Sequence, residues 1–199
     1  MEINKDINKD ISFVVLLEEM KKINRMTKVI GIDRRENDAE HSWHVAIMSM
    51  ILEKYSIEEI DVNKVIKMLL VHDIVEIYAG DTFAYDELGN ASKMQRELDS
   101  MDKLKAQVSE PMGDYIEALW LEFDNRESKE AKYANAMDRL QPILSNIYHP
   151  SGGTWKENNV SIKQVMKRID PIKDFNMEVY NAVCEKVKEA LEKGYLTAN

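Results

Sequence analysis

The chain has 199 residues, a length that fits one domain and allows a hydrophobic core without disulfides or structural metals. Glycine (7) and proline (4) are scarce, while Leu, Ile, Met, Glu and Lys are plentiful, and this composition favours helix over sheet. The formal net charge of −9 argues against binding to a nucleic-acid polymer. The single cysteine, Cys184, excludes an intrachain disulfide and a cluster of thiolate ligands.

The first residues of the chain are polar and lack the apolar core of a signal peptide. No apolar run approaches the roughly 20 residues that a helix needs to span a bilayer. We therefore expect a cytoplasmic protein without a membrane-embedded part.

Apolar residues recur at helical spacing through most of the chain. The first predicted helix runs from about 10 to 30 and is ended by Gly31. The second runs from about 37 to 55. Asn37 at its start, with Glu40 three residues later, resembles a capping box.

A third helix is predicted from about 62 to 79, with Gly80 as its stop. Further helices are predicted at about 90–108, 111–122, 128–148, 161–169 and 173–193. Pro142 predicts a kink or a break in its helix, and residues 149–159 form the clearest long loop. No segment alternates with period two for long enough to indicate a sheet. We expect an all-α fold, with residues 1–199 as a single-domain helical bundle.

His72 and Asp73 stand side by side near the end of the otherwise apolar third helix. A buried, unpaired carboxylate costs several kcal/mol, so it needs donors or a cation, and a divalent metal would serve. Imidazole and carboxylate together suit Zn, Mn, Fe or Co. The alternative is a partly exposed dipeptide at a helix end.

Asp138 lies on one helical stripe with Ala131, Ala134 and Gln141, and the residues around this acid are small. Small neighbours leave room for a bulky group beside the carboxylate. The alternative is an ordinary helical acid paired with Arg139 or with a neighbouring lysine.

His41 extends the apolar stripe of the second helix by one turn, and His44 follows at i+3. Two histidines at this spacing can bind one ion together, although each can also be a packed polar residue. Three helices thus offer a His or an Asp where apolar stripes converge, which is how helical bundles build metal sites.

The order His41, His72-Asp73, Asp138 resembles the HD-domain metal-dependent phosphohydrolases, and the similarity runs from about Leu16 to Leu144. Three segments are similar to the bacterial 5′-deoxynucleotidase branch and its relatives. These segments are Glu-His-Ser-Trp-His-Val-Ala (40–46), His-Asp-Ile-Val-Glu-Ile-Tyr-Ala-Gly-Asp (72–81) and Ala-Met-Asp-Arg-Leu-Gln-Pro (136–142).

The resemblance implies an HD-type bundle that holds one divalent ion (Mn, Co, Zn, Fe, Ni or Mg). It implies four ligands, which are His41, His72, Asp73 and Asp138. The substrate implied is a small phosphate monoester, most simply a nucleoside 5′-monophosphate, and the related enzymes are commonly homodimers.

Three further residues match family positions beside the metal. The resemblance implies that Glu76 and Asp81 position or deprotonate the attacking water, and that Asp81 also faces the substrate. Arg25 matches the arginine that contacts the substrate phosphate, with a surface salt bridge as the alternative.

Met26 departs from the family pattern, because the deoxynucleotidase has a tryptophan directly after that arginine. The preference for deoxyribose over ribose therefore stays open. Trp155, in the loop over 149–159, is either a pocket residue or a structural one. Alternative functions are hydrolysis of another phosphate ester or of a nucleotide diphosphate linkage, a non-catalytic metal- or nucleotide-binding module, and a plain helical scaffold.

Overall fold

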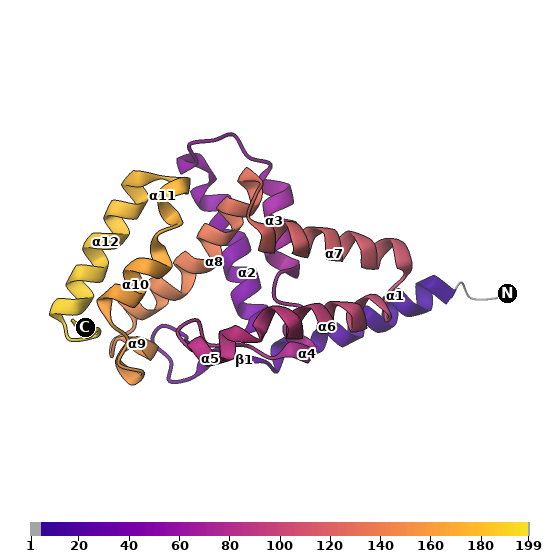
Figure 1. Ribbon diagram of the computed structural model, residues 1–199, viewed down its shortest axis with the longest axis horizontal. Coiled ribbons are helices and arrows are strands. Elements are labelled where there is room, and N and C mark those ends of the chain that lie inside the picture. Colours follow the sequence, from indigo (N-terminus) through magenta and orange to yellow (C-terminus); the bar gives the residue numbers. More distant parts are fainter. Residues whose placement is uncertain (1–4, 199) are drawn as a thin grey trace.

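The computed structural model describes residues 5–198, and these are almost entirely helical (Figure 1). In chain order the elements are α1 (Lys5–Leu16), η1 (Leu17–Lys21), β1 (Asn24–Lys28), β2 (Arg35–Asn37), α2 (Asp38–Leu52), η2 (Glu53–Tyr55), α3 (Val62–Val71), α4 (Glu76–Ala79), α5 (Glu87–Ala91), α6 (Lys93–Lys105), α7 (Glu110–Asn125), α8 (Lys129–Tyr148), α9 (Gly153–Glu157), α10 (Ile162–Ile169), α11 (Ile172–Phe175) and α12 (Met177–Glu192). The predicted all-α fold is confirmed, apart from one small two-stranded sheet that the sequence did not predict.

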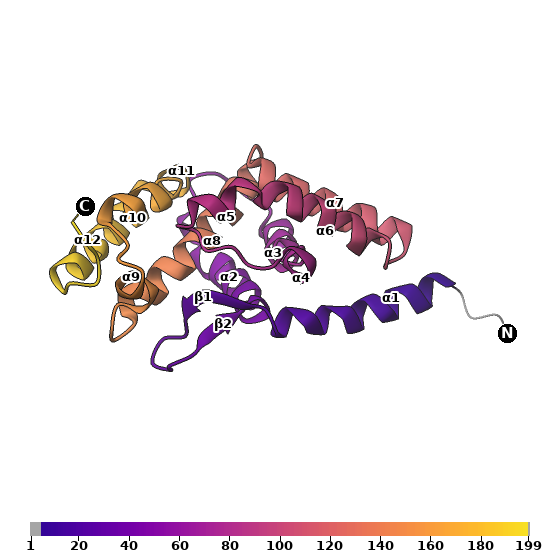
Figure 2. The same cartoon turned by 60° about the horizontal axis from the view of Figure 1, so that its bottom comes forward.

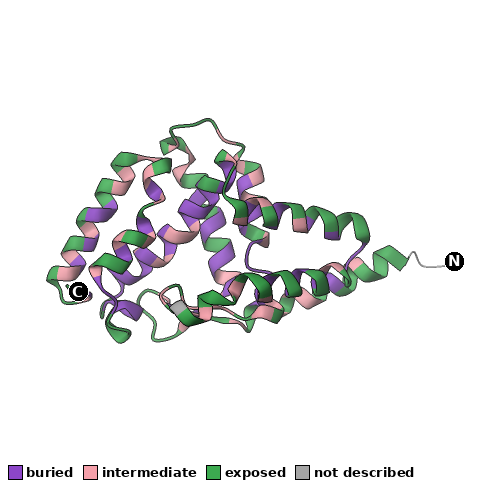
Figure 3. Cartoon of the chain, in the orientation of Figure 1, coloured by how far each residue is buried: buried purple, intermediate pink, exposed green. Residues whose placement is uncertain are grey.

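Helix α8 runs through the middle of the molecule and packs against α2, α3, α7, α10 and α11 (Figure 1). Helices α10 to α12 cover one side of it, and the long pair α6 and α7 extends to the other. Helix α1 projects away from the body toward the N-terminus (Figure 2). The amphipathic helices turn their apolar stripes inward, so that burial concentrates where α2, α3 and α8 meet (Figure 3).

Two clusters of buried apolar side chains make up the core. The larger joins α2, α3, α7, α8 and the C-terminal helices, and the smaller joins α1, η1, α6 and α7. Val71 packs against both clusters, and Ile74 and Val75 belong to the smaller one. His72 and Asp73 therefore lie at the junction of the two clusters, where they are screened from solvent on several sides.

The prediction of one helix over residues 10–30 is wrong beyond residue 21. Residues 24–28 form β1, which pairs antiparallel with β2 in the register Asn24 to Asn37 and Lys28 to Arg35. Gly31 adopts a φ of 77° in the connection, a conformation that glycine tolerates and that helps the chain reverse. The hairpin brings Arg25 beside the start of α2, a position that a continuous helix could not provide.

The third predicted helix is broken at the His72-Asp73 pair. The Nδ1 atom of His72 donates to the Leu69 carbonyl at 2.8 Å, and that oxygen is the acceptor a continuing helix would offer to the Asp73 amide. The backbone instead makes i→i−3 bonds, from Ile74 to Val71 and from Glu76 to Asp73. The break lets neighbouring side chains converge that a regular helix would separate by about 100°.

The remaining predictions hold with local corrections. Helix α8 is not broken at Pro142, although the ring removes the N–H that would bond the Asp138 carbonyl. The loop at 149–159 contains the short α9. The helices predicted at 90–108 and 173–193 are each split, into α5 with α6 and α11 with α12. The predicted capping box at the start of α2 is confirmed, with Asn37 and Glu40 each accepting the other's backbone amide.

Candidate active site

The four residues predicted as metal ligands are brought together by three separate parts of the chain. His41 lies in the first turns of α2, His72 and Asp73 lie in the turn after α3, and Asp138 lies in the middle of α8. His41 is fully buried, His72 is 5% exposed and Asp73 is 8% exposed. Their enclosure is consistent with a site closed off from bulk water.

The imidazole Nε2 atoms of His41 and His72 both face the two carboxylates. From His41 Nε2 the distances are 3.1 Å to Asp138 Oδ1 and 3.9 Å to Asp73 Oδ2. From His72 Nε2 they are 3.7 Å and 3.1 Å to the same two oxygens. Ligands about 2.1 Å from one ion lie roughly 3.0–3.4 Å apart. The donor atoms of His41, His72 and Asp73 all lie within 4.8 Å of one another, so these three groups could share an ion, and Asp138 Oδ1 adjoins them through both imidazoles.

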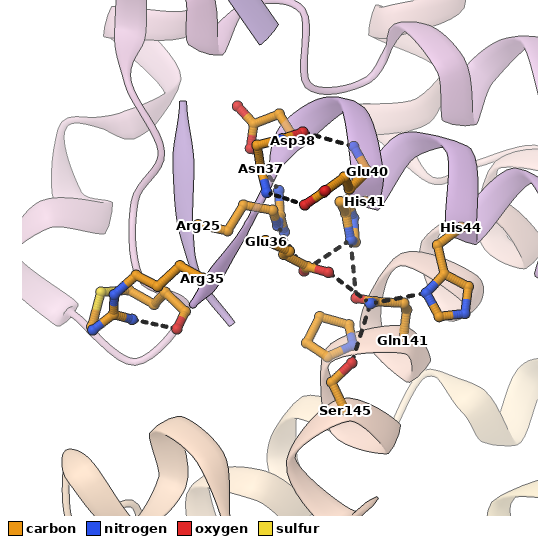
Figure 4. A network of polar contacts seen from close by, with 12 residues as sticks. Arg25, Arg35, Glu36, Asn37, Asp38, Glu40, His41, His44, Gln141 and Ser145 are labelled. Atoms are coloured by element: carbon orange, nitrogen blue, oxygen red, sulfur yellow. Dashed lines mark hydrogen bonds and ion pairs between the residues drawn. The ribbon is translucent and has the colours of Figure 1, made fainter. Parts of the chain in front are cut away.

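Gln141 sets the orientation of the His41 ring (Figure 4). Its Nε2 atom donates to the Glu36 carboxylate at 3.0 Å, and a carboxylate can only accept, so the amide oxygen must face His41. That oxygen lies 3.0 Å from His41 Nδ1, which therefore carries the proton. The lone pair is left on Nε2, which points toward Asp73 and Asp138.

His72 is held in the same tautomer by a different partner. Its Nδ1 proton goes to the Leu69 carbonyl, and its Nε2 atom is buried without a hydrogen-bond partner. Buried polar atoms are rarely left unpaired, because each costs about 1–3 kcal/mol. An unpaired ring nitrogen beside two carboxylates fits a divalent cation, as do the borderline donor atoms present.

Several buried carboxylates give this region an excess of negative charge. Burial acts to lower the pKa of His72, but the charge of Asp73 and the Asp138 carboxylate outweigh it and raise the pKa to about 10. Burial would raise the pKa of Asp73, yet the positive charges of His72 and Arg25 hold it well below its usual range. These pKa shifts indicate that a positive charge would stabilise this group of residues.

Asp38 and Glu76 form a second acidic group with Asp73, with carboxylate oxygens within 4.8 Å of one another. Burial, together with the charge of Asp73, raises the pKa of Asp38 to about 7 and the pKa of Glu76 well above its usual value. Glu76 is 2% exposed and its Oε2 atom has no hydrogen-bond partner. Burial beside other carboxylates thus favours the protonated, neutral form of the Glu76 carboxyl group.

Arg25 reaches this acidic group from β1. Its Nη1 atom lies 2.5 Å from Asp73 Oδ2 and 3.4 Å from Asp38 Oδ1, and its Nε atom lies 3.5 Å from Glu36 Oε1. Burial would lower the pKa of Arg25, but the carboxylates, Asp73 above all, raise it. The alternative of a surface salt bridge is wrong, because only 12% of the side chain is exposed.

Asp81 lies just after Gly80 and lines the same space, and burial raises its pKa. His44, in contrast, does not join the cluster. Its Nδ1 atom lies 3.3 Å from Gln141 Nε2, on the outer side of that amide, and the side chain is exposed (Figure 4). The predicted pairing of His41 with His44 on one ion is therefore not what the geometry supports.

Three features of this site were not predicted from the sequence. They are the buried positions of Glu36 and Asp38 and the orienting role of Gln141. Asp38 is fully buried and Glu36 is 4% exposed. Both belong to the polar segment 32–38 that leads into α2, where acids usually signal exposure to solvent. The only available signal was the stripe that placed Gln141 with Asp138, which indicated a shared face without indicating its partner.

A cavity of about 300 Å³ opens beside the cluster and is lined by His72, Asp73, Glu76 and Asp138. Its size is at the lower end of the range for small-ligand sites. Met26, next to Arg25, and Trp155 both line it, and Trp155 is fully buried. Met26 therefore faces the site, as the matching family position implies, and Trp155 is both a core residue and a pocket residue.

None of the helices in the described residues, 5–198, is long and apolar enough to cross a membrane.

The sequence profile of the HD domain family matches residues 17–179. The chain belongs to the HD domain family. The match extends beyond residue 144, where the stretch that carries the motifs ends, and it includes β1, α2, the turn after α3 and α8, which hold the clustered residues.

A crystal structure from Magnetospirillum magnetotacticum, described as a predicted metal-dependent phosphohydrolase, is 40% identical to this chain, with a TM-score of 0.90 and 96% of each chain covered. Among curated proteins, the 5′-deoxynucleotidase HDDC2 of Dictyostelium discoideum is 28% identical over 138 residues, which are 67% of this chain and 73% of that protein. The human HDDC2 protein is 25% identical over 135 residues. The chain spans only 65% of the human protein's length.

We expect Gln141→Ala to weaken metal binding without unfolding the protein. The change frees the His41 ring and leaves Glu36 without its amide donor, and loss of such an orienting partner typically costs about 10–100-fold in metal affinity. Metal titration monitored by calorimetry measures the effect. Gln95→Ala, on the exposed face of α6 beside Asp99, is the matched control, and equal metal affinity in the two variants would contradict the orienting role.

Proposed function

We propose that this chain is a metal-dependent phosphohydrolase that cleaves a nucleoside 5′-monophosphate to a nucleoside and inorganic phosphate, as a 5′-deoxynucleotidase does. One observation carries the proposal: two imidazole Nε2 atoms, both with Nδ1 engaged elsewhere, face the same two buried carboxylates beside a nucleotide-sized cavity. The names of the relatives support the reaction class.

His41, His72, Asp73 and Asp138 are the proposed ligands of one divalent ion. Two neutral imidazoles and two carboxylates offset the charge of the ion and leave coordination positions open. Such an ion, when bound, supplies Lewis acidity, because it lowers the pKa of a coordinated water and polarises a phosphoryl oxygen. Mn, Co, Zn, Fe, Ni and Mg all remain candidates, since this donor set suits several ions.

Glu76 is proposed to take the proton of the attacking water. Its carboxyl group lies in the cavity wall beside Asp73, and its raised pKa suits a group that accepts a proton and then returns it to the leaving nucleoside oxygen. Asp81, at the start of the following loop, also lines the cavity and is proposed to hold the substrate and to position the water.

Arg25 is proposed to offset the charge that builds on the phosphoryl oxygens. In the structure its guanidinium group is held by Asp73, Asp38 and Glu36. These contacts fix the group at the wall of the cavity.

Met26 bears on the preference for deoxyribose or ribose in the substrate. Met26 lacks the flat aromatic surface that the matching family position provides, so we propose only a modest discrimination of deoxyribose from ribose. A cytoplasmic location and a homodimer are proposed on the resemblance. The apolar residues exposed on α1, Ile11, Val14 and Val15, support an association surface. Sedimentation velocity tests the dimer, and a monomer at micromolar concentration would refute it.

The direct test is phosphate release from paired substrates, dAMP and AMP, dCMP and CMP, and their di- and triphosphates. We expect turnover of the monophosphates, its loss after EDTA dialysis and its recovery with Mn or Co. Formation of a nucleoside monophosphate from the diphosphate (with phosphate) or from the triphosphate (with pyrophosphate), without phosphate release from any monophosphate, would favour the alternative of hydrolysis at a diphosphate linkage. No hydrolysis of any substrate with any metal would refute the proposed function.

A further inference from the structure

The cavity has an acidic end and a basic end. Arg139, directly after Asp138 on α8, and Arg168, near the end of α10, line its wall away from the histidines. Asp138 separates the two ends: its Oδ1 atom faces His41 and His72, whereas its Oδ2 atom lies 3.8 Å from Arg168 Nη2. Arg168 therefore approaches the Asp138 oxygen that does not face the two histidines, and Arg139 lies beside Arg168, to whose carbonyl it donates.

Arg139 is a partly buried cation without a carboxylate partner. No acid in the described part of the chain lies within ion-pair distance of it, and its one hydrogen bond is to the Arg168 carbonyl at 3.4 Å. The other basic residues near the acidic end are paired, Arg25 with three acids and Lys93 with Glu97. The positive charge of Arg139 thus has no counterion within ion-pair distance among residues 5–198.

Arg126, which follows α7 in the left-handed conformation, also lines this end of the cavity. Burial and the nearby charges of Arg168 and Arg126 lower the pKa of Arg139 to about 10. In a chain with a net charge of −9, three arginines gathered on one wall of a small-molecule cavity are an unusual local arrangement. Planar guanidinium groups match phosphate oxygens in a two-pronged geometry.

We propose that Arg139 and Arg168 bind a second phosphoryl group of the substrate, separate from the one that is hydrolysed. The inference rests on the proposed function and narrows its substrate class to nucleotides with two phosphoryl groups, either a 3′,5′-bisphosphate or a 5′-diphosphate. The hydrolysed group belongs at the acidic end, because His41, His72 and Glu76 lie there. Arg139, which has no ion pair among the described residues, leaves its charge available for the second group, with Arg168 beside it.

Binding is measured by isothermal titration calorimetry on the metal-loaded protein carrying Glu76→Gln, which prevents turnover. The probes are dAMP, 2′-deoxyadenosine 3′,5′-bisphosphate and dADP. We expect at least one of the two-phosphate probes to bind about tenfold more tightly than dAMP, since each charge-assisted pair contributes on that scale. The tighter of the two identifies where the second phosphoryl group is attached.

In this background Arg139→Gln and Arg168→Gln should each reduce the affinity ratio of that probe to dAMP about tenfold. Arg139→Lys keeps the positive charge but lacks the two-pronged guanidinium geometry. It should therefore retain part of the affinity ratio. The control is Arg34→Gln, whose side chain pairs with Glu40 on the surface and does not line the cavity. Thermal unfolding of each variant establishes that it is folded.

The inference would be overturned if Arg139→Gln and Arg168→Gln left the affinity ratio of the two-phosphate probe to dAMP unchanged. Equal affinity of the starting protein for all three probes would overturn it too. An equal loss of affinity for dAMP and the two-phosphate probes would assign the arginines to the hydrolysed phosphate and would also overturn it. Failure of the proposed function looks different, because the protein with Glu76 intact would then release no phosphate from dAMP whatever the calorimetry shows.

Discussion

Asp73→Ala should abolish both metal binding and phosphate release. The Asp73 carboxylate contacts His72 Nε2 at 3.1 Å and Arg25 Nη1 at 2.5 Å, so its removal takes away one proposed ligand and the main partner of the arginine. The remaining ligands are left beside a guanidinium group that keeps only its longer contacts to Asp38 and Glu36, and its less compensated charge disfavours a cation nearby. We expect turnover to fall on the order of 10³-fold, comparable with loss of a group that stabilises transition-state charge.

Elemental analysis after gel filtration and phosphate release from dAMP measure the two losses in the same sample. Asp170→Ala is the matched control, because this acid lies on the surface and pairs only with Lys173 in the next turn. A variant at Asp73 that retains stoichiometric metal and full turnover would show that the ion, if one is bound, is held elsewhere.

Glu76→Gln should keep the metal and lose turnover. Glutamine has nearly the same shape as glutamate but cannot take the proton of the attacking water. General-base contributions are typically about 10²–10⁴-fold, and we expect kcat to fall within that range with little change in KM. The buried, unpartnered Oε2 atom also predicts that the fold tolerates the change, since a neutral group is less costly to bury than a carboxylate.

Metal content and kcat are again compared in one preparation, now with Glu97→Gln as the control. Glu97 is also largely buried and lines the cavity, but it pairs with Lys93 at 3.2 Å. Loss of metal from Glu76→Gln would move this residue into the set of ligands. Full turnover with metal retained would exclude it as the base.

The sequence determined the helical character of the chain and the identity of the main chemical groups. Helical spacing of apolar residues predicted α2, α6, α7, α8 and α10 within a few residues. The Asn37 and Glu40 pair predicted the start of α2, because capping depends on residues three apart in the chain. The motif around His72-Asp73 and the positions of His41 and Asp138 predicted which side chains would cluster.

Only the tertiary structure decided how those groups are arranged. The hairpin that carries Arg25, the break at His72 and the burial of Glu36 and Asp38 all depend on partners far away in the chain. Gln141 meets His41 across 100 positions and Glu36 across 105. Local propensity does not encode such contacts, since the energy of burying a carboxylate beside an arginine exists only once both are in place.

Two arginines that look alike in the sequence have different ion-pair partners in the structure. Arg25 and Arg139 are both arginines in helix-compatible segments, yet one is held by three acids and the other has none within ion-pair distance in the described residues. The sequence identified the His and Asp side chains that cluster. Packing decided which basic side chains pair with acids and which line the cavity without an acid within ion-pair distance among the described residues.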